Sequence, residues 1–504
     1  MRSRAPRLGT GARLLLTGWV VYTLHFATDI AREHYPAFSL AERATLRVDP
    51  YLGLHPDLFA VPGRGAFINN NPGASLLGAL PYAVARPLVD VVAARAIADR
   101  SDGPPPEFAD PRPDRREFFA RAYARGLDIR FGLAAGVIQA FGTAPLSAAM
   151  LLVMYAVLCR FGFSARESMW LALIYGFATP IFFRAAFLNH NLFVAHATLG
   201  GFALLQRADG IARDPRRLAA AGAVTGTGLL CDYAGAVPLV ALGIYALARL
   251  WKALPAGQAI SRFGAMVAGA CVPVGALLAY QAWAFGHPLL PAQHYMPATQ
   301  YSGQGWNGFA WPALDLLAQN LLDPRFGLLA FGPLLGLAFA QPLLGNRDRS
   351  RIRPPERALA LGLFFALLVF ASANQYARLQ WNTGFRMLAP AVPLLFVLCA
   401  DVLTQLPRRI AIALVGLAAA HSWCLAMVRA DAIASIATVL TSGPRLPWLT
   451  SVWRAGGSYL PLAPGQLSPS LLAAPFLALG AALLVWIWTR GWPEGQRRIE
   501  RAQG

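Results

Sequence analysis

The stretch LLLTGWVVYTLHFATDI at residues 14–30 is an apolar run that is long enough to cross a bilayer and that ends near a carboxylate, Asp29. A membrane-spanning helix needs about 20 mainly apolar residues, and about 17 suffice. Four arginines between residues 2 and 13 precede the run, as in a secretory signal peptide, but no small-x-small cleavage site follows it. We therefore expect an uncleaved first helix over residues 14–29.

The composition of the whole chain agrees with a membrane protein. Hydrophobic residues make up 56% of the 504 residues and charged residues only 14%. The mean hydropathy is +0.45, whereas a soluble domain has about 25% charged residues. The formal net charge is +19, but every cation except Lys252 is an arginine, and the arginines stand in short runs between apolar stretches. That arrangement orients helices in a bilayer and leaves no basic domain that could bind nucleic acid.

Further apolar runs along the chain satisfy the same length rule. The sequence therefore predicts an all-α integral membrane protein, a single polytopic domain over residues 1–504 with about 12 transmembrane helices. The expected spans are 14–29, 138–158, 167–183, 188–206, 217–232, 233–250, 263–285, 326–344, 358–374, 386–404, 409–428 and 472–490.

The basic residues between the spans predict on which side each loop lies. With a cytoplasmic N-terminus, 24 of the 44 Lys and Arg residues fall on inner segments, seven fall in short outer loops, and 13 fall in the long segment 30–131. Short cytoplasmic loops are enriched in Lys and Arg, and long loops are exempt from this rule. We therefore expect both termini to be cytoplasmic. The arginine-rich, lysine-poor and alanine-rich composition suggests a bacterial inner membrane.

Residues 30–131 form the expected long first extracytoplasmic loop. Within it, residues 73–97 are apolar but are interrupted by prolines and charged residues. As a spanning helix, this segment would reverse the sides of every later loop, so we favour an interfacial amphipathic helix. Residues 112–130 predict a second interfacial helix, because arginines and aromatic residues fall on different faces. The proline-rich linker DGPPPEFADP joins the two, and 429–470 is expected to be a further extracytoplasmic loop.

The histidines and several other polar residues collect on the predicted outer side. All eight histidines fall on the outer half, whereas the inner loops carry arginines and carboxylates without histidine. Ionisable groups at membrane depth are costly and usually line a pathway or a site. The candidates are Asp29 after the first helix, Asn189, His190 and Asn191 at the start of the fourth, Asp232 between the fifth and sixth, and Arg386 at the start of the tenth.

Each candidate also has a purely structural interpretation. Asp29 can simply end a helix at the headgroup level, and His190 between two asparagines can be a helix cap. Asp232 can stabilise the turn between two spans, and Arg386 can be a headgroup anchor. The deeper His196 and His421 are better explained as interhelical hydrogen bonds than as catalytic groups.

Familiar metal and nucleotide motifs are absent from the sequence. The five cysteines lie in or at the ends of apolar segments without CxxC spacing, and no HExxH occurs. No GxxxxGK[ST] occurs either, so no nucleotide hydrolysis is expected. No metal ligands are assigned, although a divalent cation stays possible as a cofactor.

Several of these segments together resemble the polytopic C-type glycosyltransferases, the superfamily that includes protein O-mannosyltransferases and aminoarabinose transferases. Those enzymes are similar in having one helix followed by a long extracytoplasmic loop that opens with an acidic residue, here Asp29. The stretches NNNPGASLLGALPYAVARP at 69–87, FRAAFLNHNLFVAHATLGGFALLQR at 183–207 and FRMLAPAVPLLF at 385–396 are similar in layout to family elements. The family often has an acidic residue where this chain has Asn189, His190 and Asn191.

The resemblance implies a cell-envelope glycosyltransferase that moves a hexose or pentose from a polyprenyl-phosphate donor to an acceptor on the extracytoplasmic face. The acceptor would be a glycan, a lipid or a protein. Asp29 would act as the base and Arg386 would hold the donor phosphate, supported by Arg378. The substrate-binding residues would be His190, Asn189, Asp232, His294 and Asn382. A base near the acceptor hydroxyl and an arginine near the leaving phosphate suit this chemistry.

Two other functions stay open from the sequence. A lipid or polyprenyl-sugar transporter or flippase predicts polar groups near mid-membrane and discontinuous helices, and the one-sided histidines argue against it. A non-catalytic relative with a scaffolding role is supported by the missing acidic residue near position 190.

Overall fold

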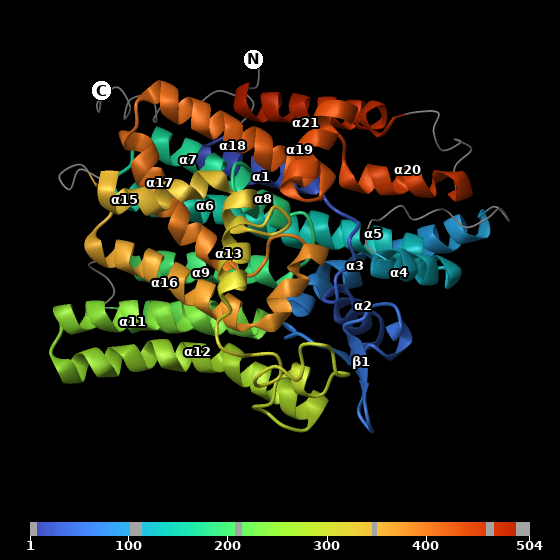
Figure 1. The fold of residues 1–504 in the computed structure, drawn as a ribbon, viewed down its shortest axis with the longest axis horizontal. Helices are drawn as coiled ribbons and strands as arrows, with labels where there is room; N and C mark the ends of the chain where they lie inside the picture. Colours follow the sequence, from blue (N-terminus) through green and yellow to red (C-terminus); the bar gives the residue numbers. More distant parts are fainter. Residues whose placement is uncertain (1–7, 101–112, 207–213, 345–349, 460–467, 490–504) are drawn as a thin grey trace, which may run out of the picture.

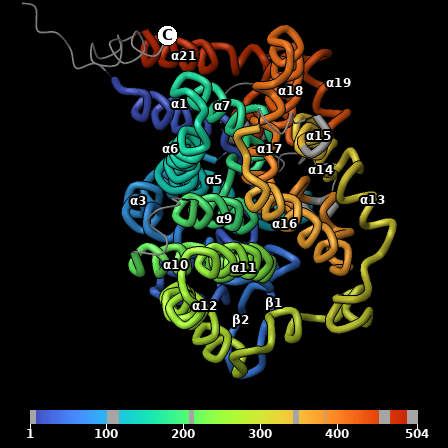
Figure 2. The backbone as a smooth tube through the Cα atoms, turned by 90° about the vertical axis from the view of Figure 1, so that its left-hand side faces the viewer, coloured from blue at the N-terminus to red at the C-terminus, as the bar shows by residue number. Residues whose placement is uncertain are grey.

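The computed structural model describes residues 8–100, 113–206, 214–344, 350–459 and 468–489. Long helices run roughly parallel to one another (Figure 1), and a view turned by 90° shows many of them end-on (Figure 2). A β-hairpin, β1 (Leu58–Val61) paired antiparallel with β2 (Gly65–Ile68), lies at one end of this bundle. The all-α prediction omitted this hairpin. It forms because two short apolar strands flank a tight turn in which Gly63 takes a positive φ angle, as does Gly65 at the start of β2.

Within the described ranges, seven helical segments are long and apolar enough to cross a membrane, and the chain is therefore a membrane protein. One of them, Asp128–Arg160, consists of α5 (Asp128–Ile138), a π-helical turn and α6 (Ala144–Arg160). Tyr233–Ala253 consists of a short 3-10 turn and α11 (Ala236–Ala253). The others are single helices: α3 (Gly73–Ala98), α12 (Ala256–Phe285), α16 (Pro354–Ala373), α18 (Arg408–Val428) and α21 (Pro469–Thr489).

Most of the other expected spans are helices of 13 to 17 residues, so the predicted number of spans is not confirmed. These shorter helices are α1 (Thr10–Leu24), α7 (Ala165–Phe177), α9 (His190–Gln206), α10 (Pro215–Cys231) and α17 (Val392–Gln405).

The expected span 326–344 is wrong as a continuous helix. The chain forms α14 (Leu328–Phe331), a 3-10 turn and α15 (Leu337–Leu344) instead. The break falls at Gly332 and Pro333, because proline cannot donate the helical hydrogen bond. Gly332 also packs so closely on the ring of Pro180 that a Cβ would lie 2.6 Å from its Cδ.

The long first loop contains more regular structure than two interfacial helices. It includes α2 (His34–Arg43), the hairpin and α3, and α3 is a continuous helix of 26 residues despite two internal prolines. Because α3 meets the length and hydropathy needed for a span, its interfacial placement stays a prediction. The expected helix 112–130 is divided into α4 (Pro113–Ala124) and the start of α5, with Gly126 at a φ of +63° between them. The proline-rich linker lies largely outside the described residues.

The remaining helices connect the bundle at its ends. They are α8 (Pro180–Arg184), α13 (Leu314–Leu322), α19 (Ala432–Ser442) and α20 (Pro447–Tyr459). The last two occupy the loop that was expected over 429–470, of which residues 460–467 lie outside the described part.

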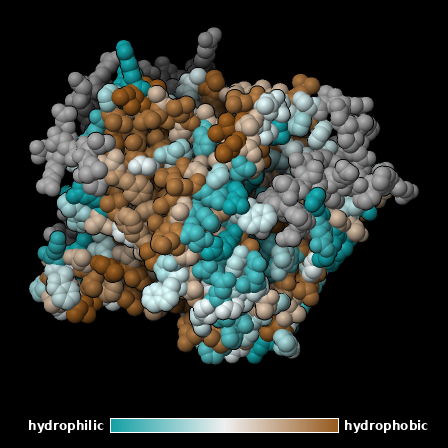
Figure 3. Space-filling model, in the orientation of Figure 1, coloured by the Kyte–Doolittle hydropathy of each residue, from teal (hydrophilic) through white to brown (hydrophobic). Residues whose placement is uncertain are grey.

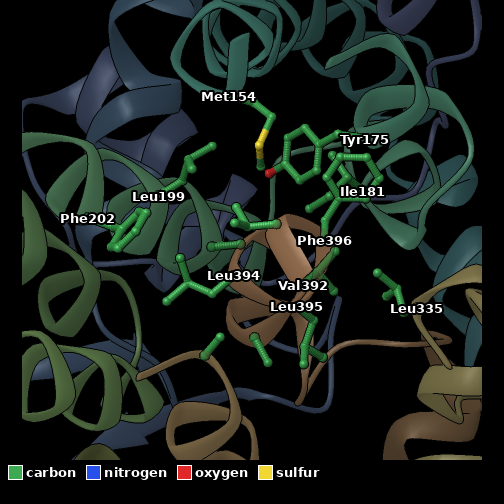
Figure 4. Packing of buried hydrophobic residues seen from close by; sticks show 14 of the residues in the cluster. Met154, Tyr175, Ile181, Leu199, Phe202, Leu335, Val392, Leu394, Leu395 and Phe396 are labelled. Atoms are coloured by element: carbon green, nitrogen blue, oxygen red, sulfur yellow. The ribbon is translucent and has the colours of Figure 1, made fainter. Parts of the chain in front are cut away.

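Helix α9 is the central element of the bundle. All of its residues except Gly200 and Leu204 are buried, as expected for a helix that is apolar all round and surrounded by others. It packs against α6, α10 and α17, and Figure 2 shows it in the interior. Leu199 and Phe202 of α9 lie close to Met154 of α6 and Leu394 of α17 in the core (Figure 4).

Small residues bring α10 and α12 into close contact. A Cβ at Gly222 would overlap the carbonyl oxygen of Met266, and a Cβ at Gly269 would overlap that of Ala219. Helices in membranes associate through such small residues because lipid tails supply no hydrophobic driving force between helices.

Arginines from the predicted inner loops hold the C-terminal end of α9. Arg160 donates to the carbonyl of Ala203 at 2.7 Å and Arg217 to that of Leu204 at 2.6 Å. Arg249 donates to the carbonyls of the next two residues at 3.1 and 3.3 Å. The last carbonyls of a helix have no partner within it, and cations stabilise this end. These three arginines therefore mark the end of the bundle opposite to His190.

The face of the molecule seen in Figure 3 divides into two regions. A broad hydrophobic area covers the long helices, and a hydrophilic area lies beside it toward the side of α2 and β1. The hydrophilic area thus lies toward the end of the bundle at which α9 begins.

Candidate functional site

Polar and charged side chains from distant parts of the sequence gather at the end of the bundle where α9 begins. We call this group the rim cluster. Each member lies in a connection or at a helix end, where ionisable groups can be kept out of the hydrocarbon layer. Its members are Asp29, Arg32 and Glu33 between α1 and α2, Asp57 next to β1, Asn69, Asn70 and Asn71 after β2, Arg184, Asn189 and His190 around the α8–α9 connection, Asp232 after α10, Arg386 before α17, and Arg429 after α18.

His190 lies between two carboxylates at the centre of the cluster. Its Nδ1 contacts Oε1 of Glu33, and its Nε2 lies 3.1 Å from Oδ2 of Asp232. The side chain of Glu33 is 1% exposed, whereas that of Asp232 is 18% exposed. The three side chains form a chain of contacts from the interior toward the surface, which we call the acid–histidine trio.

Arg32 ties the hairpin region to this trio. Its Nη1 donates to Asp57 at 2.9 Å and to the amide oxygen of Asn69 at 2.7 Å, and its Nε lies 3.4 Å from Glu33. Burial alone would raise the pKa of Glu33, but His190 and Arg32 hold it well below its usual range. Glu33 is therefore a buried carboxylate whose ionised form is stabilised by its contacts with His190 and Arg32.

Three consecutive asparagines join the long loop to three different elements. Asn69 donates to Asp57 at 2.9 Å, and Asn70 donates to Oε1 of Glu33 at 3.1 Å. Asn71 donates to the carbonyl of Leu229 at the end of α10 at 2.7 Å. The run NNN, which precedes α3, thus fixes this loop against the trio.

Arg184 and Asn189 form a compact pair in the α8–α9 connection. The amide oxygen of Asn189 accepts from Nη2 and Nε of Arg184 at 2.7 and 3.2 Å. Its amide nitrogen donates to the carbonyls of Arg184 and Phe187, both at 2.8 Å, and its oxygen also caps α9 at Leu192. Burial lowers the pKa of Arg184 to about 9, and Arg429 and Arg386 contribute in the same direction. Three arginines therefore lie near one another.

Asp29 lies beside Arg429. The Nε of Arg429 is 3.5 Å from Oδ2 of Asp29, and its Nη1 donates to the carbonyl of Phe183 at 2.9 Å. The carboxylate of Asp29 is 21% exposed. Asp29 is therefore at the arginine-rich part of the cluster, whereas Asp232 belongs to the trio.

Arg386 lies within reach of charges from several elements. Its Nε is buried and has no hydrogen-bond partner among the described residues. Burial and the charge of Arg32 lower the pKa of Arg386 to about 10. Three carboxylates act in the opposite direction: Asp57, Asp232 and Glu33. A buried donor without a partner costs about 1–3 kcal/mol, and the partner that best fits a guanidinium is a carboxylate or a phosphate.

The structure brings five of the sequence candidates into the rim cluster and leaves others apart. The five are Asp29, Asn189, His190, Asp232 and Arg386. Arg378 is instead paired with Asp315 of α13, with Nη2 3.1 Å from Oδ1. His294 lies in the turn Ala292–His294 and is 3.5 Å from the amide of Asn307. Asn382 ends a 3-10 helix, and its side chain is outside the described part.

Sequence reasoning missed the residues that connect the candidates. Arg184 and Arg429 were counted as loop charges, although their side chains are almost fully buried. Glu33 lies in AREHYP, a mixed-charge loop in which no sequence pattern marks this residue as buried. The run of three asparagines was part of a quoted motif and was the clearest unused signal.

Among the described residues, no group of three or more His, Cys, Asp or Glu side chains could hold a metal ion. The trio contains one imidazole and two carboxylates, but the imidazole occupies the space between the two acids. The arrangement brings together cations that can bind an anion and a carboxylate that can receive a proton.

Comparisons with known proteins do not assign this chain to a family. No model of a known family matches the chain, and no curated protein matches it. Among solved structures, the chain is similar to the apo form of the oligosaccharyltransferase of Archaeoglobus fulgidus, with 12% identity and a TM-score of 0.39. The similarity covers 91% of this chain, which spans 60% of the length of that protein. At this level the likeness does not identify a function.

Proposed function

We propose that the chain is a membrane glycosyltransferase that moves a hexose or pentose from a polyprenyl-phosphate donor to an acceptor on the extracytoplasmic face. The observation that carries the proposal is the unpartnered, buried Nε of Arg386 within a cluster of arginines and carboxylates. A site of this kind binds an anion and also offers a base. Both are required when a sugar leaves a phosphate and joins a hydroxyl group.

The arginines suit the leaving group of this reaction. When the bond between the anomeric carbon and the phosphate oxygen breaks, its electron pair stays on the phosphate, which becomes more negative. A guanidinium beside that oxygen stabilises the transition state more than the ground state, and this difference accelerates the reaction. Arg386 is the proposed contact, and Arg184 and Arg429 raise the positive potential around it.

The surroundings of the cluster suit a lipid-linked donor. Helix α3 begins directly after the asparagine run, and Ser75 in its first turn donates to the carbonyl of Glu33 at 2.8 Å. Farther along α3, large apolar side chains are exposed: Leu80, Val84, Leu88 and Val91. A polyprenyl chain can lie along such a face while its phosphate stays at the cluster, because each buried methylene group contributes about 0.8 kcal/mol.

The test is sugar transfer by the purified protein in proteoliposomes, with a radiolabelled polyprenyl-phosphate sugar and membrane-extract acceptors. We expect Arg386→Ala to reduce transfer about 100-fold and to raise the apparent KM for the donor, and we expect Arg386→Lys to fall between it and the wild type. Arg325→Ala is the matched control, since Arg325 forms an exposed pair with Asp323. Equal transfer by the wild type and Arg386→Ala contradicts the proposed phosphate contact. Movement of labelled lipid across the membrane without transfer would favour a flippase instead.

A further inference from the structure

The acid–histidine trio has a proton content that follows from its geometry. Both ring nitrogens of His190 face a carboxylate oxygen: Nδ1 faces Glu33, and Nε2 faces Asp232. An ionised carboxylate only accepts hydrogen bonds, and a neutral imidazole has a single N–H. With one proton, one of the two contacts would set two lone pairs against each other. The trio therefore holds two protons, one for each contact.

The two acids differ in what surrounds them. Glu33 is enclosed: besides His190 it receives Nδ2 of Asn70 at 3.1 Å and the guanidinium of Arg32 at 3.4 Å. Asp232 is more exposed, and among the described residues its Oδ1 receives the backbone N–H of Ala234 at 2.7 Å while its Oδ2 faces the imidazole. Each carboxylate oxygen can accept two hydrogen bonds. Asp232 therefore keeps the capacity to receive a hydroxyl proton and is open to the surface, whereas the side chain of Glu33 is only 1% exposed and its contacts with His190, Asn70 and Arg32 all fall on Oε1.

We propose that Asp232 accepts the proton of the acceptor hydroxyl, and that His190 and Glu33 are positioning residues that hold Asp232 in place. This inference rests on the proposed glycosyl transfer and names its base. The acceptor oxygen forms a bond to the anomeric carbon, the bond from that carbon to the phosphate oxygen breaks, and its electron pair leaves with the phosphate. The hydroxyl proton passes to Asp232, and no other reactant is needed.

Asp29, the base expected from the sequence, is less suited to this step. Its carboxylate lies beside Arg429 near Phe183, in the part of the cluster where arginines predominate. The charge of Asp232 acts on Arg386, and Asp232 also lies 3.1 Å from Nε2 of His190, so it lies between Arg386 and the rest of the trio. The charge of Asp57 acts on Arg386 as well, but Asp57 is engaged by Arg32 and by Asn69, both at 2.9 Å. Asp232 is therefore the carboxylate that we place beside a hydroxyl next to a phosphate bound at Arg386.

Several titratable and charged groups act on the trio from the elements packed around it and shape its response to pH. They are Arg32 and His34 from the α2 region, Asp57 next to β1, Arg184 from α8 and Arg386 before α17. Since the arginines stay charged, the pH dependence of transfer is expected to follow the carboxylates and histidines of this group.

The first experiment compares carboxylate variants in the proteoliposome transfer assay. We expect Asp232→Asn to lower kcat at least about 100-fold while the donor KM changes about threefold or less. We expect Asp29→Asn to keep kcat within about tenfold. Glu117→Gln, an exposed change on α4, is the matched control. Glu33→Gln, which keeps the shape of the buried acid, should lower kcat and move the pH profile. The assignment is overturned if Asp29→Asn shows the large loss and Asp232→Asn does not.

The second experiment needs no activity. Solid-state NMR of protein with 15N-labelled histidine counts the protons on the imidazole rings, and His190→Gln identifies the signals of His190. We expect both ring nitrogens of His190 to be protonated at pH 7 in the wild type, and one of them to lose its proton in Asp232→Asn. His196→Gln, a change at another buried histidine of α9, serves as the folding control. A neutral His190 ring in the wild type, unchanged by Asp232→Asn, overturns the trio. If the wild type transfers no sugar, the proposed function itself fails, which is a different result from transfer that survives Asp232→Asn.

Discussion

The guanidinium of Arg429 lies 4.2 Å from the centre of the Phe183 ring and donates from Nη1 to the carbonyl oxygen of the same residue at 2.9 Å. The contact joins the end of α18 to α8, although the two residues are 246 positions apart. It also places a positive charge beside Asp29. The side chain of Arg429 thereby connects the end of α18 to the loop that follows α1.

Arg429→Gln should destabilise the protein. The variant loses a charged hydrogen bond, a cation–π contact and the partner of Asp29, and a buried hydrogen bond to a charged group contributes about 1.5–3 kcal/mol. A lower Tm in detergent, followed by intrinsic fluorescence, is the measurement. Arg64→Gln is a useful comparison, because Arg64 donates to the Trp283 carbonyl at an exposed position. An unchanged Tm for Arg429→Gln would contradict the connecting role.

His34 makes the outer end of the protein sensitive to acid. Burial lowers its pKa from the usual 6.5 to about 4, and its Nδ1 lies 3.1 Å from the backbone nitrogen and 3.2 Å from the carbonyl oxygen of Ala31. Between pH 6.5 and pH 4 the unfolded chain therefore binds a proton that the folded chain does not. The free energy of unfolding should decrease by about 3 kcal/mol as the pH falls through this window and should change little above it.

The measurement for His34 is Tm against pH for the wild type, His34→Gln and His287→Gln. The first variant should have a smaller decrease between pH 7 and pH 4. The second should behave as the wild type, because His287 is exposed in a loop. Parallel curves for the wild type and His34→Gln would assign the acid sensitivity to other groups.

The close contact between α10 and α12 gives a prediction with a control on one of the same helices. Gly222→Ala places a Cβ against the Met266 carbonyl and should cost about 2 kcal/mol or more. Gly275→Ala on α12 meets no atom within 4 Å and should leave the stability unchanged or slightly higher, because alanine favours the helix by up to about 1 kcal/mol. Thermal denaturation of both variants in the same detergent compares them directly, and equal Tm values would exclude the tight contact.

Asn189 should stabilise the protein through both the oxygen and the nitrogen of its side-chain amide. Asn189→Ala removes the partner of Arg184 and the cap of α9, and we expect a loss of about 2–3 kcal/mol. Asn189→Asp keeps the acceptor but sets a second oxygen against the carbonyls of Arg184 and Phe187. If Asn189→Asp is as stable as the wild type, the two donor contacts contribute nothing. Chemical unfolding followed by tryptophan fluorescence distinguishes the two variants.

The long, uninterrupted apolar runs were predictable from sequence, and the interrupted ones were not. The expected spans 358–374, 409–428 and 472–490 lie within a few residues of α16, α18 and α21, because about 20 apolar residues in a row leave a helix as the main choice. The run 326–344 is equally apolar, but its helix breaks at Gly332 and Pro333. A hydropathy average over the run does not reveal this break.

The sequence predicts those site residues that lie at the ends of apolar runs, but not those that lie in charged loops. His190, Asp232 and Arg386 stood out as polar residues at the ends of apolar runs. Glu33 did not stand out, because it lies among other charged residues in a loop, and its burial depends on contacts with α9 and on the asparagine run. Long-range pairing of this kind is a property of tertiary structure. The assignment of Asp29 as base stays a prediction, which the comparison with Asp232→Asn tests.

Helix α9 has a further electrostatic consequence. The peptide dipoles of a helix add up to about half a positive charge at its N-terminus and half a negative charge at its C-terminus. Guanidinium groups neutralise the negative end at Ala203, Leu204 and Leu205, whereas the positive end opens on the rim cluster at Asn189 and His190. Low-dielectric packing surrounds the helix, so its field is weakly screened. The first turn of α9 therefore adds a fixed partial positive charge to the rim cluster, and this charge stabilises the ionised carboxylates beside His190.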